Sequence, residues 1–227
     1  MQFMCLLRAP EGEGEGLATW YREVYAQQLL AQAPGLERFI VNVPTPVPAE
    51  LQLYGGAESA RSRPYDVIAQ MWFDSRGPFD AATASLEGEL CRRSIDRHVY
   101  RMSETVALNK PELLPGNPAP GFKLMRGLFF HEDMPDAAVQ RSWALHQNLA
   151  VKVHVGLARY VRHWVDEVIT PEAPRIRGMS DLHFPDERSL VERYFDSDRG
   201  KEEILHDIGH FIEGGTARMF AKEFLVK

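Results

Sequence analysis

The 227-residue chain has few of the features that mark secreted and membrane proteins. It has only two cysteines, Cys5 in a predicted strand and Cys91 in a predicted helix, which we interpret as reduced core thiols rather than a structural bridge. No apolar run approaches the roughly 20 residues that span a bilayer. The N-terminal residues 1–16 turn acidic at once and lack a basic region followed by a long apolar core, so they do not resemble a signal peptide. We therefore expect a cytoplasmic protein.

An excess of positive charge and several catalytic motifs are also missing. The chain has 26 basic and 32 acidic residues, which give a formal net charge of −6, and no basic stripe is present. Nucleic acid and anionic membrane are therefore poor partners. The sequence contains no GxGxxG, Walker loop, CxxC pair, HExxH or GxSxG motif. We expect neither a cofactor nor a metal ion.

The composition that remains is that of a globular protein, with 44% apolar and 26% charged residues. The chain is organised around residues 143–164, WALHQNLAVKVHVGLARYVRHW, which predict a helix followed by a strand. His146 lies on an apolar stripe that recurs every three or four residues along this helix. Gly156 follows, a residue that can take the left-handed conformation that ends a helix.

This stretch has a counterpart 121 residues earlier in the chain. Residues 1–43 align without a gap with residues 122–164, and Tyr25 then stands opposite His146. A repeat of this length indicates two copies of one domain. The length of the chain suffices for two domains of about 110 residues each.

Both halves share one predicted element order, strand-helix-strand-strand-helix-strand, which is the ferredoxin-like arrangement. A Pro-rich linker, residues 109–120, separates a first repeat, residues 1–108, from a second, residues 121–227. Long loops, residues 44–63 and 170–178, lie between the second and third strands. The predicted strands are 2–7, 38–43, 65–73, 102–108, 122–130, 159–165, 179–184 and 222–226, and the predicted helices after the first are 79–98, 135–153 and 199–213.

The segments WYREVYAQQLLAQAPGLERFIVN (residues 20–42) and 143–164 resemble the EthD-like domains of the dimeric α+β barrel superfamily. The shared pattern is an aromatic residue, a His a few residues on, Pro-Gly and an aromatic strand. His146 matches the His of this pattern, whereas Tyr25 occupies its place in the first half, and Lys-Val-His-Val-Gly replaces Ala-Pro-Gly in the second. The resemblance implies an α+β fold in which two tandem ferredoxin-like repeats form one barrel within the chain.

Proteins of this superfamily have many activities. They include cofactor-free monooxygenases, muconolactone isomerase, polyketide cyclases, aldoxime dehydratase and haem peroxidases, and some members have no assigned activity. The fold alone therefore does not select a reaction.

Seven of the eight histidines lie at or after residue 131, which indicates a chemically active second half. His146 is the first candidate, because a buried His can transfer a proton near neutral pH. A core His satisfied by a neighbouring carbonyl is the alternative. His183 and Asp181 share one face of a predicted strand, where the carboxylate can fix the tautomer of the imidazole. An interface polar pair is the alternative here.

The strand 159–165 offers a second kind of site. Tyr160, Arg162 and Trp164 share one face, which can hold a flat anionic or phenolic ligand by stacking and a charged hydrogen bond, whereas His163 points the opposite way. Snorkelling at a domain interface is the alternative. The pair His206 and His210 falls on the wet face of its helix, so we expect a surface pair rather than a metal site.

These patterns predict one set of functional residues. The predicted catalytic residues are His146, His183, Asp181 and Tyr160, and the predicted substrate contacts are Arg162, Trp164, Trp143, Tyr25 and His163. The first hypothesis is a cofactor-independent lyase, a decarboxylase that acts on a small aromatic or polyketide-like carboxylate in aromatic-compound catabolism. Arg162 would hold the carboxylate, and His146 or His183 would protonate the carbanion.

Three alternatives stay open. In a cofactor-free monooxygenase, the same His would deprotonate a phenol whose anion reacts with oxygen. The other two are a non-catalytic EthD-like protein that binds small molecules and a haem-binding protein. The partner in the enzymatic hypotheses is an aromatic small molecule, and the chain could also form a homodimer.

Overall fold

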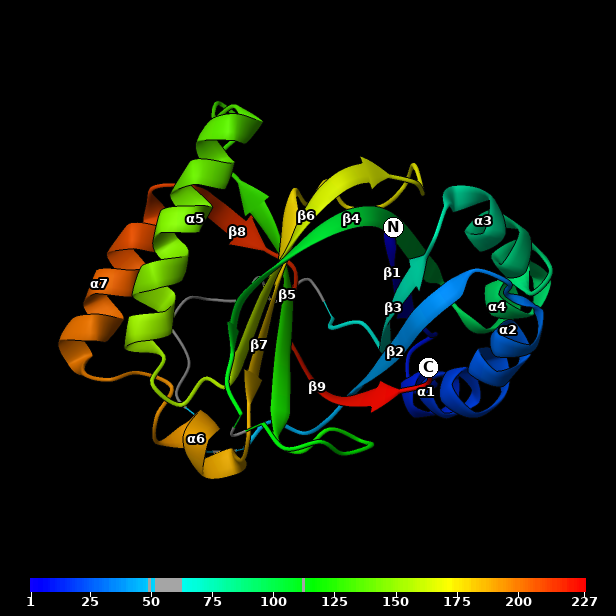
Figure 1. Ribbon diagram of the computed structural model, residues 1–227, viewed down its shortest axis with the longest axis horizontal. Coiled ribbons are helices and arrows are strands. Elements are labelled where there is room, and N and C mark those ends of the chain that lie inside the picture. The colour runs from blue at the N-terminus through cyan, green and yellow to red at the C-terminus, as the bar shows by residue number, and fades with distance from the viewer. Residues whose placement is uncertain (49, 52–62, 112) are drawn as a thin grey trace.

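The computed structural model describes residues 1–48, 50–51, 63–111 and 113–227, which form one antiparallel β-barrel flanked by helices (Figure 1). The strand order is β7-β6-β4-β1-β3-β2-β9-β5-β8, and an additional pairing of β7 with β5 closes the sheet. Eight of the described strands thus form the barrel, while β8 pairs with β5 beyond the end of β9. The strands are β1 (Gln2–Arg8), β2 (Leu36–Pro44), β3 (Val67–Phe73), β4 (Asp96–Asn109), β5 (Phe122–Phe130), β6 (Arg159–Val168), β7 (Gly178–Phe184), β8 (Ile212–Gly215) and β9 (Met219–Leu225).

The helices lie outside the barrel in two groups, which occupy opposite sides of the molecule in Figure 1. The first-half group is α1 (Gly14–Trp20), the π-helical η1 (Tyr21–Tyr25), α2 (Ala26–Gln32), α3 (Arg76–Ala84) and α4 (Glu87–Arg93). The second-half group is α5 (Asp136–Val153), α6 (Glu187–Val191) and α7 (Asp198–Gly209). Each group covers the outer face of the strands of its own half, so every strand there has a helix-facing and a barrel-facing side.

The strand β1 shows how this arrangement follows from alternation. Phe3, Cys5 and Leu7 pack among the first-half helices, whereas Met4 and Leu6 point into the barrel. Since successive side chains of a strand point to opposite faces, a strand covered on both faces is apolar throughout. The continuous apolar run at residues 2–7 therefore predicts a strand that is buried on both faces, and β1 is such a strand.

The two halves share a single sheet. The strand β4 pairs with β6 and β2 pairs with β9, and these two seams join residues before and after the predicted linker. The order of strands is β4-β1-β3-β2 in the first half and β6-β7-β5-β9 in the second. The α+β barrel expected from the sequence is therefore present.

Two predicted helices are too long. The helix expected at 79–98 is broken into α3 and α4 and ends at Arg93, and His98 belongs to β4. The helix expected at 199–213 ends at Gly209, and the short strand β8 that follows was not predicted. In both places the chain leaves the helix to pair with a barrel strand, which local periodicity does not report.

Gly156 lies three residues after the end of α5, and the reason for a glycine there differs from the one expected. It does not have a positive φ, whereas Gly35, its counterpart in the alignment, has a φ of 81°. A Cβ on Gly156 would lie 2.2 Å from the carbonyl oxygen of Ser189. Close approach of another backbone, rather than a left-handed conformation, therefore requires glycine here.

Other expectations concern the cysteines, the long loop and membrane spanning. Cys5 is buried as expected, but Cys91 is exposed on α4, so it is not a core thiol. Residue 49 and residues 52–62 of the long loop, and residue 112 of the linker, lie outside the described residues. Among the described helices, none is both long and apolar enough to cross a membrane.

Candidate active site

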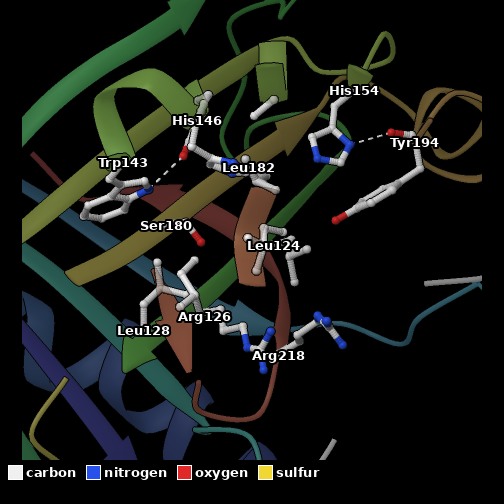
Figure 2. Close-up of a pocket in the computed structure, with 14 residues that line it drawn as sticks. Leu124, Arg126, Leu128, Trp143, His146, His154, Ser180, Leu182, Tyr194 and Arg218 are labelled. Carbon is white, nitrogen blue, oxygen red and sulfur yellow. Dashed lines mark hydrogen bonds between the residues drawn. The ribbon is translucent and has the colours of Figure 1, made fainter. Parts of the chain in front are cut away.

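A small cavity lies between the outer face of the second-half strands and the helices α5 and α7 (Figure 2). Its volume is about 80 Å³. The strands contribute leucines such as Leu124 and Leu182, so much of the wall is apolar. The polar groups that reach it include His146 from α5 and Ser180 from β7. An apolar cavity with a few convergent polar groups is the usual form of a small-molecule site.

His146 is positioned by a carboxylate on the neighbouring helix. Its Nδ1 lies 2.6 Å from Oδ2 of Asp207 in α7, and the ring also packs against Phe211. Since a carboxylate only accepts, the Nδ1–H of His146 donates this hydrogen bond. The Nε2 lone pair of the neutral ring then makes no hydrogen bond to the described residues and remains available for a proton.

The electrostatics of His146 favour this neutral form. The side chain is only 7% exposed, and burial lowers the pKa of His146 below its ordinary value although Asp207 opposes the shift. A neutral imidazole oriented by a carboxylate is the arrangement of a general base. The burial expected from the apolar stripe is therefore present, and the partner is a side-chain carboxylate rather than a carbonyl.

Two further polar groups border the cavity next to His146. Trp143 lies one helical turn before it and donates a hydrogen bond from Nε1 to the Tyr160 hydroxyl over 3.2 Å. Burial raises the pKa of Tyr160 to about 12, so its hydroxyl stays protonated at neutral pH. Tyr160 can therefore position a ligand but does not act as a base.

Two arginines extend toward the cavity from the end opposite His146. Figure 2 shows Arg126 and Arg218 together at this end, and both line the cavity. Arg126 also donates from Nε to the carbonyl of Thr216 over 3.1 Å.

A second, larger hollow adjoins the first at Trp143. This outer groove has a volume of about 390 Å³ and is lined by Ser103, Thr105, Gln140, Trp143, Arg162, Trp164 and Asp166. It lies on the outer face of the seam where β4 pairs with β6, in the register Thr105 to Arg162 and Ser103 to Trp164. The predicted grouping of Arg162 with Trp164, away from His163, is present in the structure.

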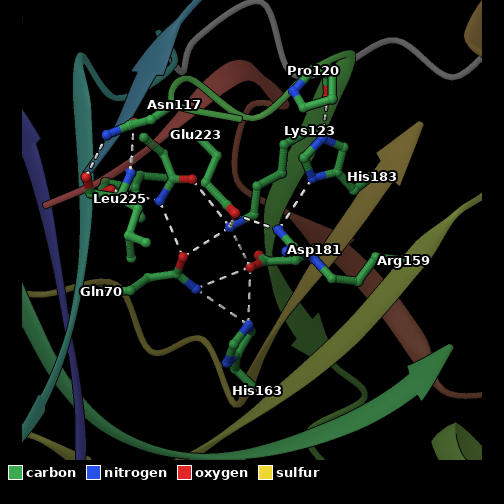
Figure 3. A network of polar contacts seen from close by, with 12 residues as sticks. Gln70, Asn117, Pro120, Lys123, Arg159, His163, Asp181, His183, Glu223 and Leu225 are labelled. Atoms are coloured by element: carbon green, nitrogen blue, oxygen red, sulfur yellow. Dashed lines mark hydrogen bonds and ion pairs between the residues drawn. The ribbon is translucent and has the colours of Figure 1, made fainter. Parts of the chain in front are cut away.

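The barrel interior contains a third cavity, of about 160 Å³, next to a network of buried charges (Figure 3). Lys123 is 2% exposed and lies 2.9 Å from both Asp181 Oδ2 and Glu223 Oε2. Arg159 pairs with the same Glu223 carboxylate. Burial alone would raise the pKa of Asp181, but Lys123 and His163 outweigh it and hold the pKa far below its usual range.

The predicted pairing of Asp181 with His183 is not formed. Both side chains face the barrel interior as expected, but Asp181 Oδ2 lies 3.0 Å from Nε2 of His163 instead. The Nε2–H of His183 donates to the Pro120 carbonyl over 2.9 Å, and Arg159 donates to its Nδ1 over 3.1 Å. With both ring nitrogens engaged, His183 has no lone pair for a substrate.

Other predicted residues lie away from these cavities or have other roles. Tyr25 is 2% exposed and stacks on Tyr21 in the first-half core, and it lines none of the three cavities. His154 borders the small cavity, but burial lowers its pKa to about 4, and its Nδ1–H donates to the Tyr194 carbonyl. His206 and His210 are exposed neighbours on α7.

The sequence reasoning missed Asp207, Arg126 and Lys123. Lys123 carried a signal, since a lysine inside the apolar strand FKLMRGLFF must face a polar partner. Asp207 carried none, because its role depends on the packing of α7 against α5. Within the described part of the chain, no group of three or more His, Cys, Asp or Glu residues is arranged to hold a metal ion.

The small cavity does not fit haem, which the resemblance left open. Ligand pockets are usually ~300 Å³ or larger, and a space of about 80 Å³ between described side chains does not hold a tetrapyrrole. The residues present are suited to proton transfer on part of a small molecule.

No family model and no curated protein matches the chain. A solved "anthrone oxidase-like protein" matches with a TM-score of 0.63 and 9% identity, covering 100% of this chain and 91% of that one. A "putative monooxygenase" from Fusobacterium nucleatum matches with a TM-score of 0.58 and 9% identity, over 100% and 92%.

A dye-decolorizing peroxidase from Bacteroides thetaiotaomicron also matches, with a TM-score of 0.54 and 12% identity, over 97% of this chain and 92% of that one. The chain has the dimeric α+β barrel fold. At identities this low, a structural likeness establishes the fold alone. The EthD-like type and the tandem repeat are not established by it.

The decarboxylase hypothesis is wrong. The similar structures carry the names of an anthrone oxidase-like protein and a monooxygenase, which favour the oxygenase alternative over a lyase.

Proposed function

We propose that the protein is a cofactor-free monooxygenase that acts on a phenolic substrate whose hydroxyl edge enters the small cavity, with His146 as the general base. The observation that carries this proposal is the pair of His146 and Asp207 at the cavity wall, with Nδ1 held 2.6 Å from the carboxylate. The names of two similar structures support the reaction class.

The reaction requires one proton acceptor and a site that stabilises an anion. His146 Nε2 takes the proton of the phenolic hydroxyl, and the imidazolium that forms beside the Asp207 carboxylate stabilises the phenolate that remains. An electron-rich anion of this kind transfers an electron to dioxygen, and the radical pair combines into a peroxide at a ring carbon. The protonated His146 returns its proton to the terminal peroxide oxygen. Loss of water from that carbon, where a C–H bond and the O–O bond break, then leaves a carbonyl group and the neutral base.

We also propose the domain organisation that the sequence predicts. The strand orders of the two halves support tandem ferredoxin-like repeats of EthD-like type, bounded as 1–108 and 121–227. A cytoplasmic location and a homodimer remain predictions as well. Size-exclusion chromatography with light scattering would measure the oligomeric state.

The first prediction tests the general base. Replacing His146 with Gln keeps a hydrogen-bonding side chain of similar size but removes titration near pH 7. We expect the rate of oxygen uptake with an anthrone or a hydroxynaphthalene to fall by roughly 10²–10⁴-fold. The melting temperature should stay within a few degrees of the parent. Full oxygen uptake by a folded His146→Gln protein, or no uptake by the parent with any phenol, would contradict the proposal.

A further inference from the structure

The outer groove contains a cation that has no partner in the described chain. Arg162 forms no hydrogen bond or ion pair with the described residues, and its Nε is buried without a partner. Its guanidinium lies over the Trp143 ring at 5.3 Å from the centroid. A half-buried guanidinium with unused donors has lost water contacts that no protein group replaces.

The carboxylate in the lining of the groove, that of Asp166, does not pair with Arg162. Asp166 accepts a hydrogen bond from the Ser103 hydroxyl over 2.7 Å and pairs with Arg101 at 3.2 Å. Arg162 is therefore an available cation in a groove that has the half-buried Trp164 as an aromatic wall and a polar rim, while Trp143 is buried beneath the guanidinium. This combination suits a flat ring that carries an anionic group, because the ring stacks and the guanidinium binds two oxygens.

The groove and the small cavity meet at Trp143, which lines both. Trp143 and His146 are one turn apart on α5, about 5 Å along the helix axis. The small cavity, of about 80 Å³, can hold only an edge of an aromatic substrate, and the outer groove, of about 390 Å³, can hold the remainder. A molecule that spans both would place its hydroxyl at His146 and its far end at Arg162.

We propose that the outer groove is a carboxylate subsite, in which Arg162 binds the carboxylate of an aromatic ligand whose ring packs beside the half-buried Trp164. Binding in this subsite requires no turnover. Only the identification of the ligand as the substrate, a phenolic aromatic carboxylate, rests on the proposed function.

The test uses 2-naphthoate, which lacks a phenolic hydroxyl, and its uncharged analogue 2-naphthamide. Isothermal titration of the full chain measures both dissociation constants, and quenching of tryptophan fluorescence reports on Trp143 and Trp164. We expect naphthoate to bind more tightly than naphthamide. Arg162→Met, which keeps the apolar stem, should weaken naphthoate binding by roughly 10- to 150-fold and leave naphthamide binding unchanged.

Two further variants separate the subsite from general effects. Arg162→Lys should restore part of the affinity, because a lysine keeps the charge but not the two-pronged geometry. Arg188→Met, on the exposed helix α6, should leave both constants unchanged. Circular dichroism confirms that each variant is folded. No measurable naphthoate binding, equal affinities of the parent for the two ligands, or an unchanged constant in Arg162→Met would each overturn the subsite.

Oxygen uptake distinguishes the two proposals. With a hydroxynaphthoate as substrate, Arg162→Met should raise KM far more than it lowers kcat. If no phenol is oxidised while naphthoate binding still depends on Arg162, the monooxygenase proposal fails and the subsite stands. If phenols are oxidised and Arg162→Met changes neither naphthoate binding nor KM, the subsite fails and the monooxygenase proposal stands.

Discussion

At the scale of single residues, the buried histidines His146, His154 and His183 differ in the partners of their ring nitrogens. His146 has a carboxylate on one ring nitrogen and a cavity at the other. His183 has both nitrogens occupied, and His154 donates to a backbone carbonyl. What a buried histidine can do therefore depends on its second nitrogen, because only a free lone pair can accept a proton from a ligand.

Asp207 should set the pH dependence of the proposed reaction. Its carboxylate raises the pKa of His146 against the larger effect of burial, so removing its charge lowers that pKa further. In Asp207→Asn, which can still accept the hydrogen bond, the acid limb of kcat/KM should move to lower pH. The neighbouring exposed His206→Asn is the matched control. A limb that stays in place or moves upward would show that Asp207 does not act on the base.

His154 should make the fold sensitive to acid. Burial lowers its pKa from 6.5 to about 4, so the unfolded chain takes up the proton first as the pH falls. Stability is therefore complete above pH 6.5 and decreases toward pH 4. One such group costs about 2 kcal/mol of unfolding free energy between pH 7 and pH 5. Urea titrations should show this loss reduced in His154→Asn, while His206→Asn keeps the full slope.

At the scale of elements, close contacts determine where helices end and strands begin. The end of α5 is an example, because its glycine faces the backbone of α6 rather than adopting a left-handed turn. The strand β6 begins three residues later and carries Tyr160 to the small cavity and Arg162 to the outer groove. The local sequence shows that a glycine follows the helix, but it does not show that α6 packs against this glycine.

Gly156→Ala should therefore be destabilising. The new methyl group would lie 2.2 Å from the Ser189 carbonyl oxygen, and overpacking of this kind costs about 1–3 kcal/mol, or several degrees in melting temperature. Gly16→Ala in α1 is the matched control, because its Cβ would meet nothing within 4 Å. That substitution should stabilise the helix by about 0.5–1 kcal/mol. Equal melting temperatures for the two variants would rule out the close-approach explanation.

At the scale of the whole molecule, the buried charges join the halves. Lys123 from β5 donates to Gln70 of β3 over 2.8 Å and to Asn42 of β2 over 3.1 Å, while it pairs with Asp181 and Glu223 in its own half. The remainder of the barrel interior is an apolar cluster that also draws on both halves. The two halves therefore have a common interior and should unfold together.

Lys123→Met should test this coupling. It leaves the carboxylates of Asp181 and Glu223 buried without their shared cation, and breaking a buried pair in this way costs about 3–5 kcal/mol. We expect a single thermal transition that is shifted down as a whole. Arg188→Met, which breaks an exposed pair with Glu192, should change stability by at most about 0.5 kcal/mol. Two separate transitions in calorimetry would show that the halves unfold independently.

The sequence by itself determined which side of each element is buried. Alternation in residues 159–165 separates Arg162 from His163 correctly, and the helical stripe places His146 inside. The apolar runs predict the barrel strands, since both faces of such strands are covered. These properties depend on residues a few positions apart, so local periodicity is enough to reveal them.

Only the tertiary structure decided which of these faces meet. Asp207 lies 61 residues after His146, and the pairing of β6 with β7 brings Asp181 to His163, whereas its neighbour on the same strand, His183, bonds elsewhere. The hollow around Arg162 exists because β4 of the first half pairs with β6 of the second. Contacts between distant segments follow from the packing of whole elements, and no local pattern of residues encodes the partner of a charged side chain.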